Sequence, residues 1–398
     1  MALTKAKVSF LEGLDGAVLT GAMPALDGSS LTGISGMTKV TSDPALNTNP
    51  SGGVGTTWVN KSSGEMFVCK DATADANVWV NIGGGAGYVH DTSTFQGEIA
   101  GYAFCGWNNT TPGNVGGYNA LVNKYSFINS SNATNHGNLS VNKYDTAGNA
   151  STTHGYASGG YGPGLTPASN IIDKFAFSNN VTGTDVGNLT SPRRQTTGQS
   201  SSTHGYTTGG TAPPNTNICD KFAYASDGDA TDVGDNTLAR SACAGMNSTT
   251  HGFTAGGTTD PTNRNEIDKF SFASNNNATD VGDLTQARTG TQGASSVTHG
   301  YIMSGYIASP AGLTTRIDKF AFATNNNSTN IGDVTGSPGS SGGSCSSSVT
   351  HGYLAGGPND NAGHGHIIQR TSFSTDGDAV DTLQDLTHYM QNPGGCQE

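Results

Sequence analysis

The chain has 398 residues, of which only 12% are charged and 58 are glycine. Its 18 basic and 30 acidic residues give a net charge of −12 at pH 7, which argues against a nucleic-acid partner. Low charge and abundant small polar residues favour short strands joined by tight turns, and the length exceeds one ordinary core unless a repeat fold absorbs it.

No stretch approaches the roughly 20 apolar residues of a membrane span, so we expect no membrane insertion. Near the N-terminus, Glu12 and Asp15 interrupt the apolar run that follows Lys5 and Lys7, and a secretory signal is therefore not expected. Six cysteines lie far apart without a CxxC or Cys/His cluster, which indicates neither a zinc site nor a disulfide framework. No cofactor or metal is predicted, and the protein is expected to be made in the cytoplasm.

Residues 1 to about 50 carry small residues with little periodicity, and we expect them to be extended. Three short strands are predicted next, at Thr56–Asn60, Glu65–Lys70 and Val78–Ile82. Their apolar face would hold Trp58, Phe67 and Trp79. The GGGAG segment at 83–87 then marks the domain boundary, which gives an N-terminal region of residues 1–86 and a second domain of residues 87–398.

The N-terminal region carries a family resemblance. The segments LDGSSLTGI and TTWVNKSSGEMFVCKDATADANVWVNIGGG look like the amino-terminal regions of tail-fibre and other virion proteins of marine and cyanobacterial phages. The resemblance covers residues 1–86 and implies a structural protein whose N-terminus binds other virion proteins. Tail fibres are usually trimers, so it also admits a homotrimer, and the oligomeric state stays open.

One unit recurs through the rest of the chain. Its His-Gly step is spaced by 50, 47, 48 and 52 residues and falls at His154, His204, His251, His299 and His351. A degenerate copy begins at Ala100. A fixed period of this size is typical of solenoids, propellers and arrays.

Period-2 alternation predicts four strands in each unit. In one copy they would span Gly293–Val297, Tyr301–Ser304, Ile317–Ala323 and Asn330–Thr335. His299-Gly300 is expected to form the tight turn between the first two strands, with glycine in the left-handed region.

Four strands in about 48 residues are typical of one propeller blade, and the period is close to the roughly 50 residues of kelch repeats. The order of landmarks also resembles kelch: an arginine in the link before each first strand (Arg194, Arg240, Arg288), a Gly-Gly pair after the second strand, and an aromatic pair in the third. The fourth strand departs from that pattern because Val-Gly-Asp replaces the kelch tryptophan, so the kinship could be architectural only.

The third-strand motif occurs six times, at Val122–Phe127, Ile172–Phe177, Cys219–Tyr224, Ile267–Phe272, Ile317–Phe322 and Ile368–Phe373. We therefore predict an all-β chain in which a six-bladed kelch-like β-propeller follows a small N-terminal β-meander. Leu386 aligns with Leu284 at an offset of 102 residues, which leaves room after it for one more strand at about Gly394–Glu398. This strand is predicted to close the ring by pairing with the first blade.

Residues that recur in every unit are interpreted as structural. The histidine is expected to be a turn residue hydrogen-bonded to backbone, and the Asp-Lys pair of the third strand is expected to build the blade. The turn Ser226–Asp235 holds Asp227, Asp229 and Asp232 but no glutamate at the spacing that a calcium loop requires, so a solvated turn is favoured over a calcium site.

The variable loops between the second and third strands are the candidate binding surface, on the same side as the links between units and opposite the His-Gly turns. The candidate ligand-binding residues there are Trp107, Asn108, Tyr118, Tyr161, Arg264, Tyr306, Arg316, His364 and His366. Aromatic rings and hydrogen-bonding side chains suit a host-surface polysaccharide. Ordinary loop residues with chance aromatics are the alternative.

No nucleophile elbow, phosphate loop or HExxH motif occurs, and the repeats hold few glutamates for glycoside hydrolysis. The predicted function is therefore that of a non-enzymatic phage virion protein of the tail-fibre or receptor-binding type, located in the virion. A decoration or spacer protein of the capsid or tail and a glycan hydrolase that uses aspartates are the two alternatives.

Overall fold

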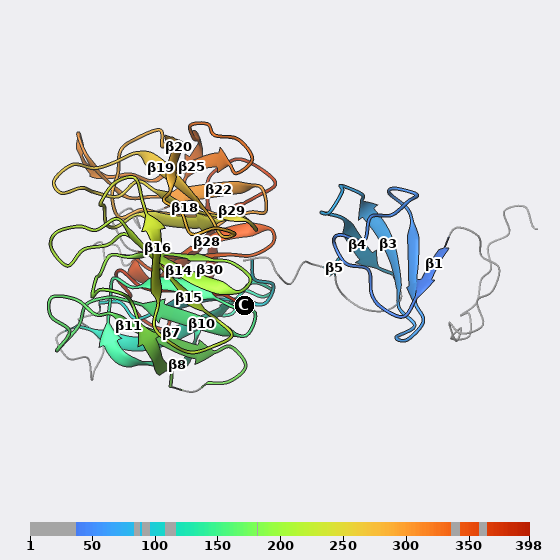
Figure 1. Ribbon diagram of the computed structural model, residues 1–398, viewed down its shortest axis with the longest axis horizontal. Helices are drawn as coiled ribbons and strands as arrows, with labels where there is room; N and C mark the ends of the chain where they lie inside the picture. Colours follow the sequence, from blue (N-terminus) through green and yellow to red (C-terminus); the bar gives the residue numbers. More distant parts are fainter. Residues whose placement is uncertain are drawn as a thin grey trace, which may run out of the picture. The chain divides into compact units, whose positions relative to one another are not determined.

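The structure is a computed structural model that describes residues 37–82, 88–89, 96–107, 117–180, 182–335, 343–357 and 364–398. The chain divides into two compact units, Met1–Asp91 and Thr92–Glu398 (Figure 1). Regular structure in the described residues is β-strand apart from the 3-10 helix η3 (His364–His366), which confirms the predicted all-β class. None of these residues forms a helix long and apolar enough to cross a membrane.

The first unit contains one five-stranded sheet. In sheet order its strands are β1 (Met37–Val40), β2 (Thr57–Asn60), β3 (Met66–Asp71), β4 (Val78–Asn81) and β5 (Tyr88–Val89). The three central strands are those expected from the sequence, and Phe67 and Trp79 are buried with Trp58 packed against them. The unit extends past the predicted boundary because β5 pairs with β4. Residues 1–36 lie outside the described residues.

The described residues of the second unit form six four-stranded antiparallel sheets. The first sheet joins the two ends of the unit: β31 (Gly394–Gln397), β6 (Ala100–Phe104), β7 (Asn119–Ser126) and β8 (Thr134–Lys143). The second holds β9 (Ala147–Ala150), β10 (His154–Ser158), β11 (Ile171–Ala176) and β12 (Thr184–Asn188), and the third holds β13 (Thr197–Ser200), β14 (His204–Thr208), β15 (Ile218–Ala223) and β16 (Thr231–Asp235).

The remaining three sheets repeat this pattern. The fourth holds β17 (Ala244–Asn247), β18 (His251–Ala255), β19 (Glu266–Ser271) and β20 (Thr279–Asp283). The fifth holds β21 (Gln292–Ser295), β22 (His299–Met303), β25 (Arg316–Ala321) and β26 (Thr329–Asp333), with the hairpin β23 (Tyr306–Ala308) and β24 (Ala311–Leu313) inserted. The sixth holds β27 (Ser344–Ser347), β28 (His351–Ala355), β29 (Ile367–Ser372) and β30 (Val380–Asp385).

The predicted position of the His-Gly turn is wrong. His299 and Gly300 are the first residues of β22 and pair with Ala321 and Phe320. The turn lies earlier, where the Ser296 amide donates to the His299 carbonyl. Gly300 is required because a Cβ there would overlap the ring of Phe320 rather than because of its backbone conformation.

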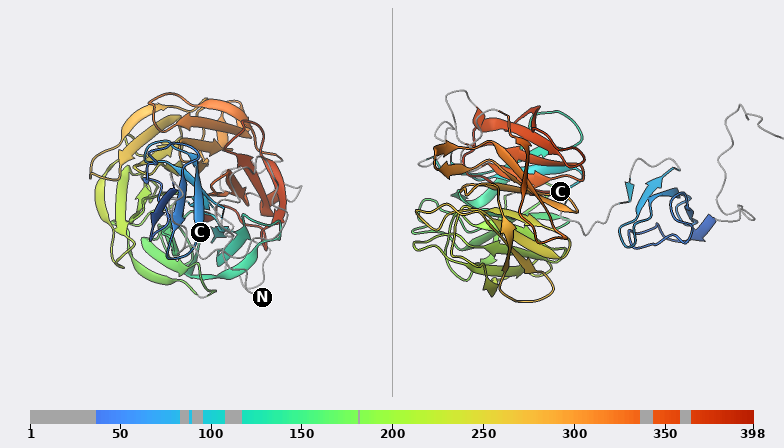
Figure 2. Two further views of the ribbon diagram at one scale, coloured as in Figure 1. Left: turned by 90° about the vertical axis from the view of Figure 1, so that its right-hand side faces the viewer. Right: turned by 90° about the horizontal axis from the view of Figure 1, so that it is seen from above.

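The six sheets surround a common axis (Figure 2). The strands nearest the axis, here called the axial strands, are β31, β9, β13, β17, β21 and β27. Each axial strand contacts the next, and β27 contacts β31, so the row closes on itself. Because β31 pairs with β6, with Cys396 opposite Tyr102, the first sheet takes its axial strand from the far end of the chain.

Glycines let the axial strands approach one another. A methyl group on Gly148 would overlap the carbonyl of Gly395, and one on Gly198 would overlap the carbonyl of Gly148. Gly245 and Gly293 meet the preceding strand in the same way. Backbone therefore contacts backbone around the axis, and a side chain at these positions would push the sheets apart.

Aromatic side chains join neighbouring sheets at six equivalent places. A ring from the second strand of one sheet lies against a ring that follows the third strand of the next, with centroids 4.5–4.9 Å apart. The pairs are Tyr102–Phe177, Tyr156–Tyr224, Tyr206–Phe272, Phe253–Phe322, Tyr301–Phe373 and Tyr353–Phe127. The last pair joins the sixth sheet to the first, so the sheet-to-sheet packing is cyclic.

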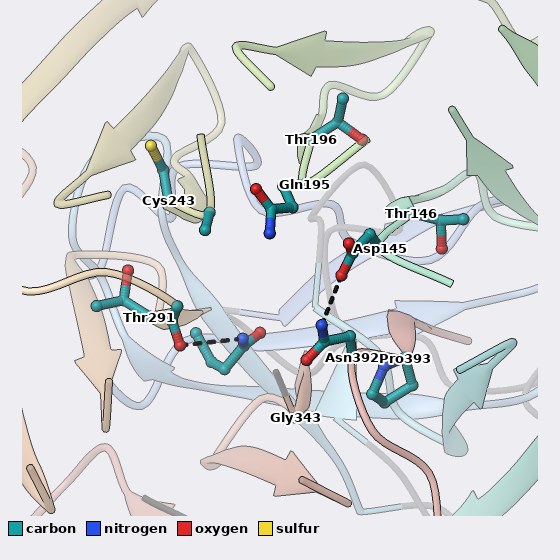
Figure 3. Close-up of a pocket in the computed structure, with 12 residues that line it drawn as sticks. Asp145, Thr146, Gln195, Thr196, Cys243, Thr291, Gly343, Asn392 and Pro393 are labelled. Atoms are coloured by element: carbon teal, nitrogen blue, oxygen red, sulfur yellow. Dashed lines mark hydrogen bonds between the residues drawn. The ribbon is translucent and has the colours of Figure 1, made fainter. Parts of the chain in front are cut away.

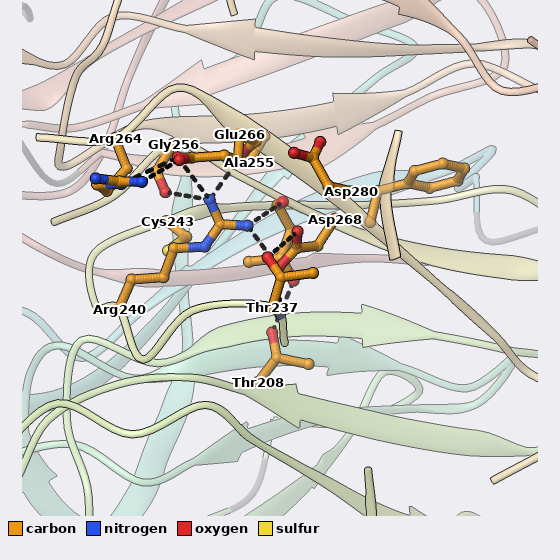
Figure 4. A network of polar contacts seen from close by, with 12 residues as sticks. Thr208, Thr237, Arg240, Cys243, Ala255, Gly256, Arg264, Glu266, Asp268 and Asp280 are labelled. Atoms are coloured by element: carbon orange, nitrogen blue, oxygen red, sulfur yellow. Dashed lines mark hydrogen bonds and ion pairs between the residues drawn. The ribbon is translucent and has the colours of Figure 1, made fainter. Parts of the chain in front are cut away.

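A buried ion pair anchors each of four sheets to the link that precedes it. In the fourth sheet, Arg240 Nη2 lies 2.9 Å from Asp268 Oδ2, and Thr237 donates to the same carboxylate through its amide and hydroxyl (Figure 4). The equivalent pairs are Lys143–Asp173, Arg193–Asp220 and Arg288–Asp318. The recurrent aspartate of the third strand therefore binds the link, as its structural interpretation requires.

In the other two sheets a neutral side chain stands at the position of the aspartate, and the described residues form no such ion pair there. In the first sheet Asn123 takes the place of the aspartate, accepting from the amide and hydroxyl of Thr387, and Met390 takes the place of the cation. In the sixth sheet Gln369 accepts from Thr335 in the same way. In the first sheet, the replacement of both partners avoids leaving one buried charge without a partner.

Candidate functional site

The described links between sheets are joined by a series of backbone hydrogen bonds around one end of the axis. In each described link one residue has a φ between 50° and 66°: Asp145, Gln195, Ala242, Gly290 and Asn392. The amide of each of the first four donates to the carbonyl of the previous one, beginning with the donation from Asp145 to Asn392. Left-handed backbone costs about 1 kcal/mol or more for a residue such as Gln195. The side chains of Asp145, Gln195 and Asn392 line the mouth of the axis at this end.

The mouth opens into two adjoining cavities. A cavity of about 120 Å³ lies on the axis and is lined by Asp145, Gln195, Gly290 and Asn392 among others (Figure 3). A second one, of about 300 Å³, shares Asp145, Gln195 and Asn392 with the first and extends over the first two sheets, where Trp107, Tyr144 and Arg194 line it. We call the second cavity the mouth cavity.

A cluster of three tyrosines reaches the mouth cavity through Tyr144, which lines it. The ring centroids of Tyr118, Tyr144 and Tyr161 lie 5.6–6.0 Å apart in all three pairs. The guanidinium of Arg194 sits 4.8 Å from the centre of the Tyr161 ring, and its Nη1 donates to the Tyr144 hydroxyl at 3.5 Å. Such a cluster offers flat apolar faces together with polar edges in a fixed geometry.

Asp145 is the acidic group of the mouth cavity. Burial raises the pKa of Asp145 to about 6, although Asn392 Nδ2 donates to its Oδ1 at 2.6 Å and Arg194 stabilises the charged form. Burial likewise raises the pKa of the Tyr144 hydroxyl. The cavity therefore holds one carboxylate with an unusual affinity for its proton, beside a cation and several aromatic rings.

Three of the predicted ligand-binding residues belong to this region. Trp107 exchanges backbone hydrogen bonds with Gln391 and lines the mouth cavity. Tyr118 and Tyr161 form the cluster with Tyr144. Asn108 lies outside the described residues. As predicted, the variable loops share one side of the unit with the links, because Tyr161 bridges Tyr144 and Thr211 bridges Arg194.

The other predicted residues lie over different sheets and do not join the cluster. Arg264 is bound by Glu266 in the fourth sheet. In the fifth sheet, Tyr306 is 40% exposed at the start of β23 and Arg316 is exposed at the start of β25. His366 Nε2 is 3.5 Å from Asp385 Oδ1, and His364 begins η3. Although their loops share one face of the unit, these residues do not converge on a single site.

Sequence reasoning missed the link residues Tyr144, Asp145, Gln195, Gln391 and Asn392. It also placed the recurrent arginine one residue too late. Arg193 aligns with Arg240 and Arg288 and is the buried partner of Asp220. Arg194 lines the mouth cavity instead. The signal was available, because 193 precedes 240 by 47 residues, the same spacing as His204 to His251.

The opposite mouth of the axis carries the recurrent histidines and the start of the unit. Each of the five histidines has its Nδ1 2.8 Å from the hydroxyl of the preceding threonine, so the predicted backbone partner is wrong. Burial lowers the pKa of each of them. Gln96 Nε2 donates to the carbonyls of Ser295 and Ser348, so the chain enters the unit on this side, away from the mouth cavity.

The acidic turn of the third sheet does not gather its carboxylates. Asp227 pairs with Lys174, Asp229 accepts from Asn188, and Asp232 accepts from the amide of Gly234. Within the described ranges of the chain, no group of three or more His, Cys, Asp or Glu residues is placed to hold a metal ion.

Neither the protein-family models nor the curated proteins yield a match to this chain.

Proposed function

We propose that this protein is a receptor-binding structural protein of a bacteriophage virion and that it binds a host-surface glycan at the mouth cavity. The observation that carries the proposal is the cluster of Tyr118, Tyr144 and Tyr161 with Arg194 beside an open cavity. Sugar rings present C–H faces that stack on aromatic rings, and their hydroxyls bind amides and carboxylates such as those of Asn392 and Asp145.

The proposed architecture is a six-bladed kelch-like β-propeller. Four-stranded sheets, axial strands in cyclic contact and six equivalent aromatic pairs all support this assignment. Likeness to kelch repeats rests on the Gly-Gly pair and the buried arginine, since the fourth strand has no tryptophan. A ring of this kind leaves only short outer sheet edges and provides a rigid frame for variable loops.

The two ends of the axis suit two different roles, attachment at one end and ligand binding at the other. The chain enters the second unit at the histidine side through Gln96, and the mouth cavity lies at the other side. A protein tethered to a particle through its N-terminal region could thus leave the cavity free for a receptor. The virion assignment itself rests on the resemblance of residues 1–86 to phage structural proteins.

Two other functions remain as alternatives. A decoration protein of the capsid or tail would need the same fold but no ligand. A glycan hydrolase would need two positioned carboxylates, whereas Asp145 is the only carboxylate that the described residues contribute to the mouth cavity. Binding without turnover is therefore the activity that the geometry favours.

The proposal is tested with the full chain on an array of bacterial surface polysaccharides. We expect binding to at least one glycan, about tenfold weaker for Tyr144→Ala or Tyr161→Ala and unchanged for the control Tyr306→Ala on the fifth sheet. Absence of binding to every glycan would favour decoration, and release of reducing sugar would favour the hydrolase. Mass spectrometry of purified phage particles tests the virion assignment separately.

A further inference from the structure

The mouth cavity contains one cation, Arg194, among the residues that line it. No carboxylate of the described residues lies within ion-pair distance of its guanidinium, even though Asp145 lines the same cavity, and the Asp145 carboxylate is engaged by Asn392 instead. The Nε of Arg194 is buried without a hydrogen-bond partner. The half-buried guanidinium is thus partly desolvated, and it interacts with the Asp145 charge without an ion-pair contact.

Comparison among the repeats indicates that the fold does not need this charge. The neighbouring Arg193 supplies the recurrent buried cation by pairing with Asp220. At the position of Arg194 the other described links carry Tyr144, Ser241, Thr289 and Gln391, all uncharged, and each forms the same backbone bridge to its loop. The side chain at this position is therefore free to vary, and in this link alone among them it is cationic.

The guanidinium is also held in place before any ligand arrives. Its central carbon lies over the Tyr161 ring, 4.8 Å from the ring centre, and the Tyr144 hydroxyl accepts from Nη1. The Nη2 group has no hydrogen bond to a described residue. A fixed guanidinium with free donors matches the two oxygens of a carboxylate, which it can bind through two parallel hydrogen bonds.

We propose that the glycan bound at the mouth cavity is acidic, with the carboxylate of a uronic acid residue bound by Arg194 and the sugar ring stacked on the neighbouring tyrosines. This inference rests on the proposed glycan-binding function and adds the class of sugar. A sulfate or phosphate ester can also present two oxygens to a guanidinium, so the test includes a sulfated arm.

The test uses the full chain and a matched set of oligosaccharides: tetramers of galacturonate, of glucuronate-containing glycan and of alginate, each compared with the same tetramer after reduction of its carboxyl groups to alcohols. Calorimetric titration should show binding of at least one acidic tetramer and about tenfold or greater weakening on reduction. Sulfated galactan tetramers form a further arm and should bind more weakly than the best uronate.

Three variants localise the effect. Arg194→Gln should lose about tenfold in affinity for the acidic tetramer and leave affinity for the reduced tetramer unchanged, while Arg316→Gln, exposed on the fifth sheet, should behave as wild type. Arg194→Lys should recover part of the loss, and the thermal midpoints of all variants check folding.

Equal affinity for the acidic and the reduced tetramers would overturn the inference while leaving glycan binding intact. Preference for the sulfated arm, or no binding of any uronate by a protein that binds a neutral glycan on the array, would also overturn it. Failure to bind any glycan at all would remove the proposed function together with the inference.

Discussion

Arg240 Nη2 and Asp268 Oδ2 lie 2.9 Å apart, and neither side chain is exposed to solvent. The same contact recurs in three other sheets, with lysine in place of arginine in one of them. In the first sheet both charges are gone, and Asn123 and Met390 stand in their places. The protein thus contains its own neutral version of the pair.

This natural replacement predicts how the ion pair responds to substitution. Asp268→Asn alone should lower the free energy of unfolding by about 3–5 kcal/mol, because it leaves Arg240 buried without a counter-ion. Combining it with Arg240→Met, which imitates the first sheet, should recover part of that loss. Urea denaturation provides the measurement, with Asp280→Asn on an exposed strand position as control. Strictly additive losses in the double variant would show that the two charges are independent.

The axial glycines predict a steric effect. Gly245→Ala should destabilise the protein by about 2–3 kcal/mol because its methyl group would overlap the Gly198 carbonyl. Gly312→Ala is the matched control, since a Cβ there meets nothing within 4 Å. Equal thermal midpoints for the two variants would mean that the axial strands are not in contact in solution.

Asp145 predicts a pH dependence of stability. Its pKa is raised to about 6 in the folded protein, against about 3.9 in an unfolded chain. The folded state thus binds the Asp145 proton more tightly than the unfolded state does. Below about pH 4 the bound proton stabilises the folded protein by about 3 kcal/mol, and this stabilisation is lost as pH rises through about 6.

The Asp145→Asn variant isolates that contribution. Relative to wild type it should gain stability between pH 4 and pH 7, whereas the exposed-site control Asp185→Asn should not. Parallel stability curves for wild type and Asp145→Asn across this range would contradict the raised pKa.

The first sheet is expected to depend on the C-terminal strand β31 for its stability. Removing residues 394–398 takes away β31, exposes the edge of β6 and deletes the carboxylate of Glu398 that Lys124 and Tyr102 contact. The truncated protein should be cleaved faster by protease in the first sheet and should self-associate through the free edge, as measured by light scattering. A monomeric and equally resistant truncation would show that the sixth and first sheets hold together without β31.

Much of the fold could be predicted from the sequence because the repeats act as an internal comparison. Strand periodicity located all four strands of the unit at 293–335, and the 102-residue offset put a strand at the position of β31. The turn before His299 was misplaced by a few residues because glycine was assumed to serve a left-handed turn, whereas Gly300 serves a close contact with Phe320.

The candidate site was harder to predict because it is assembled from two kinds of segment. The variable loops were singled out by their sequence differences, and Trp107, Tyr118 and Tyr161 were predicted as ligand-binding residues in this way. Asp145 and Asn392 sit in links of repeated conformation and meet only when the first and last repeats come together, 247 residues apart in sequence. Arg194 was taken for the recurrent arginine because it is adjacent to Arg193.

Trp107 provides the most direct measurement of the central claim, that a glycan binds at the mouth cavity. It lines that cavity, and Trp58 and Trp79 belong to the first unit, so Trp107→Phe identifies its emission. Titration of the full chain with the best glycan from the array should shift Trp107 emission and shield Trp107 from quenching by acrylamide. The change in emission should give the same Kd as calorimetry. Calorimetric binding with no change in Trp107 emission would place the ligand elsewhere and contradict the account.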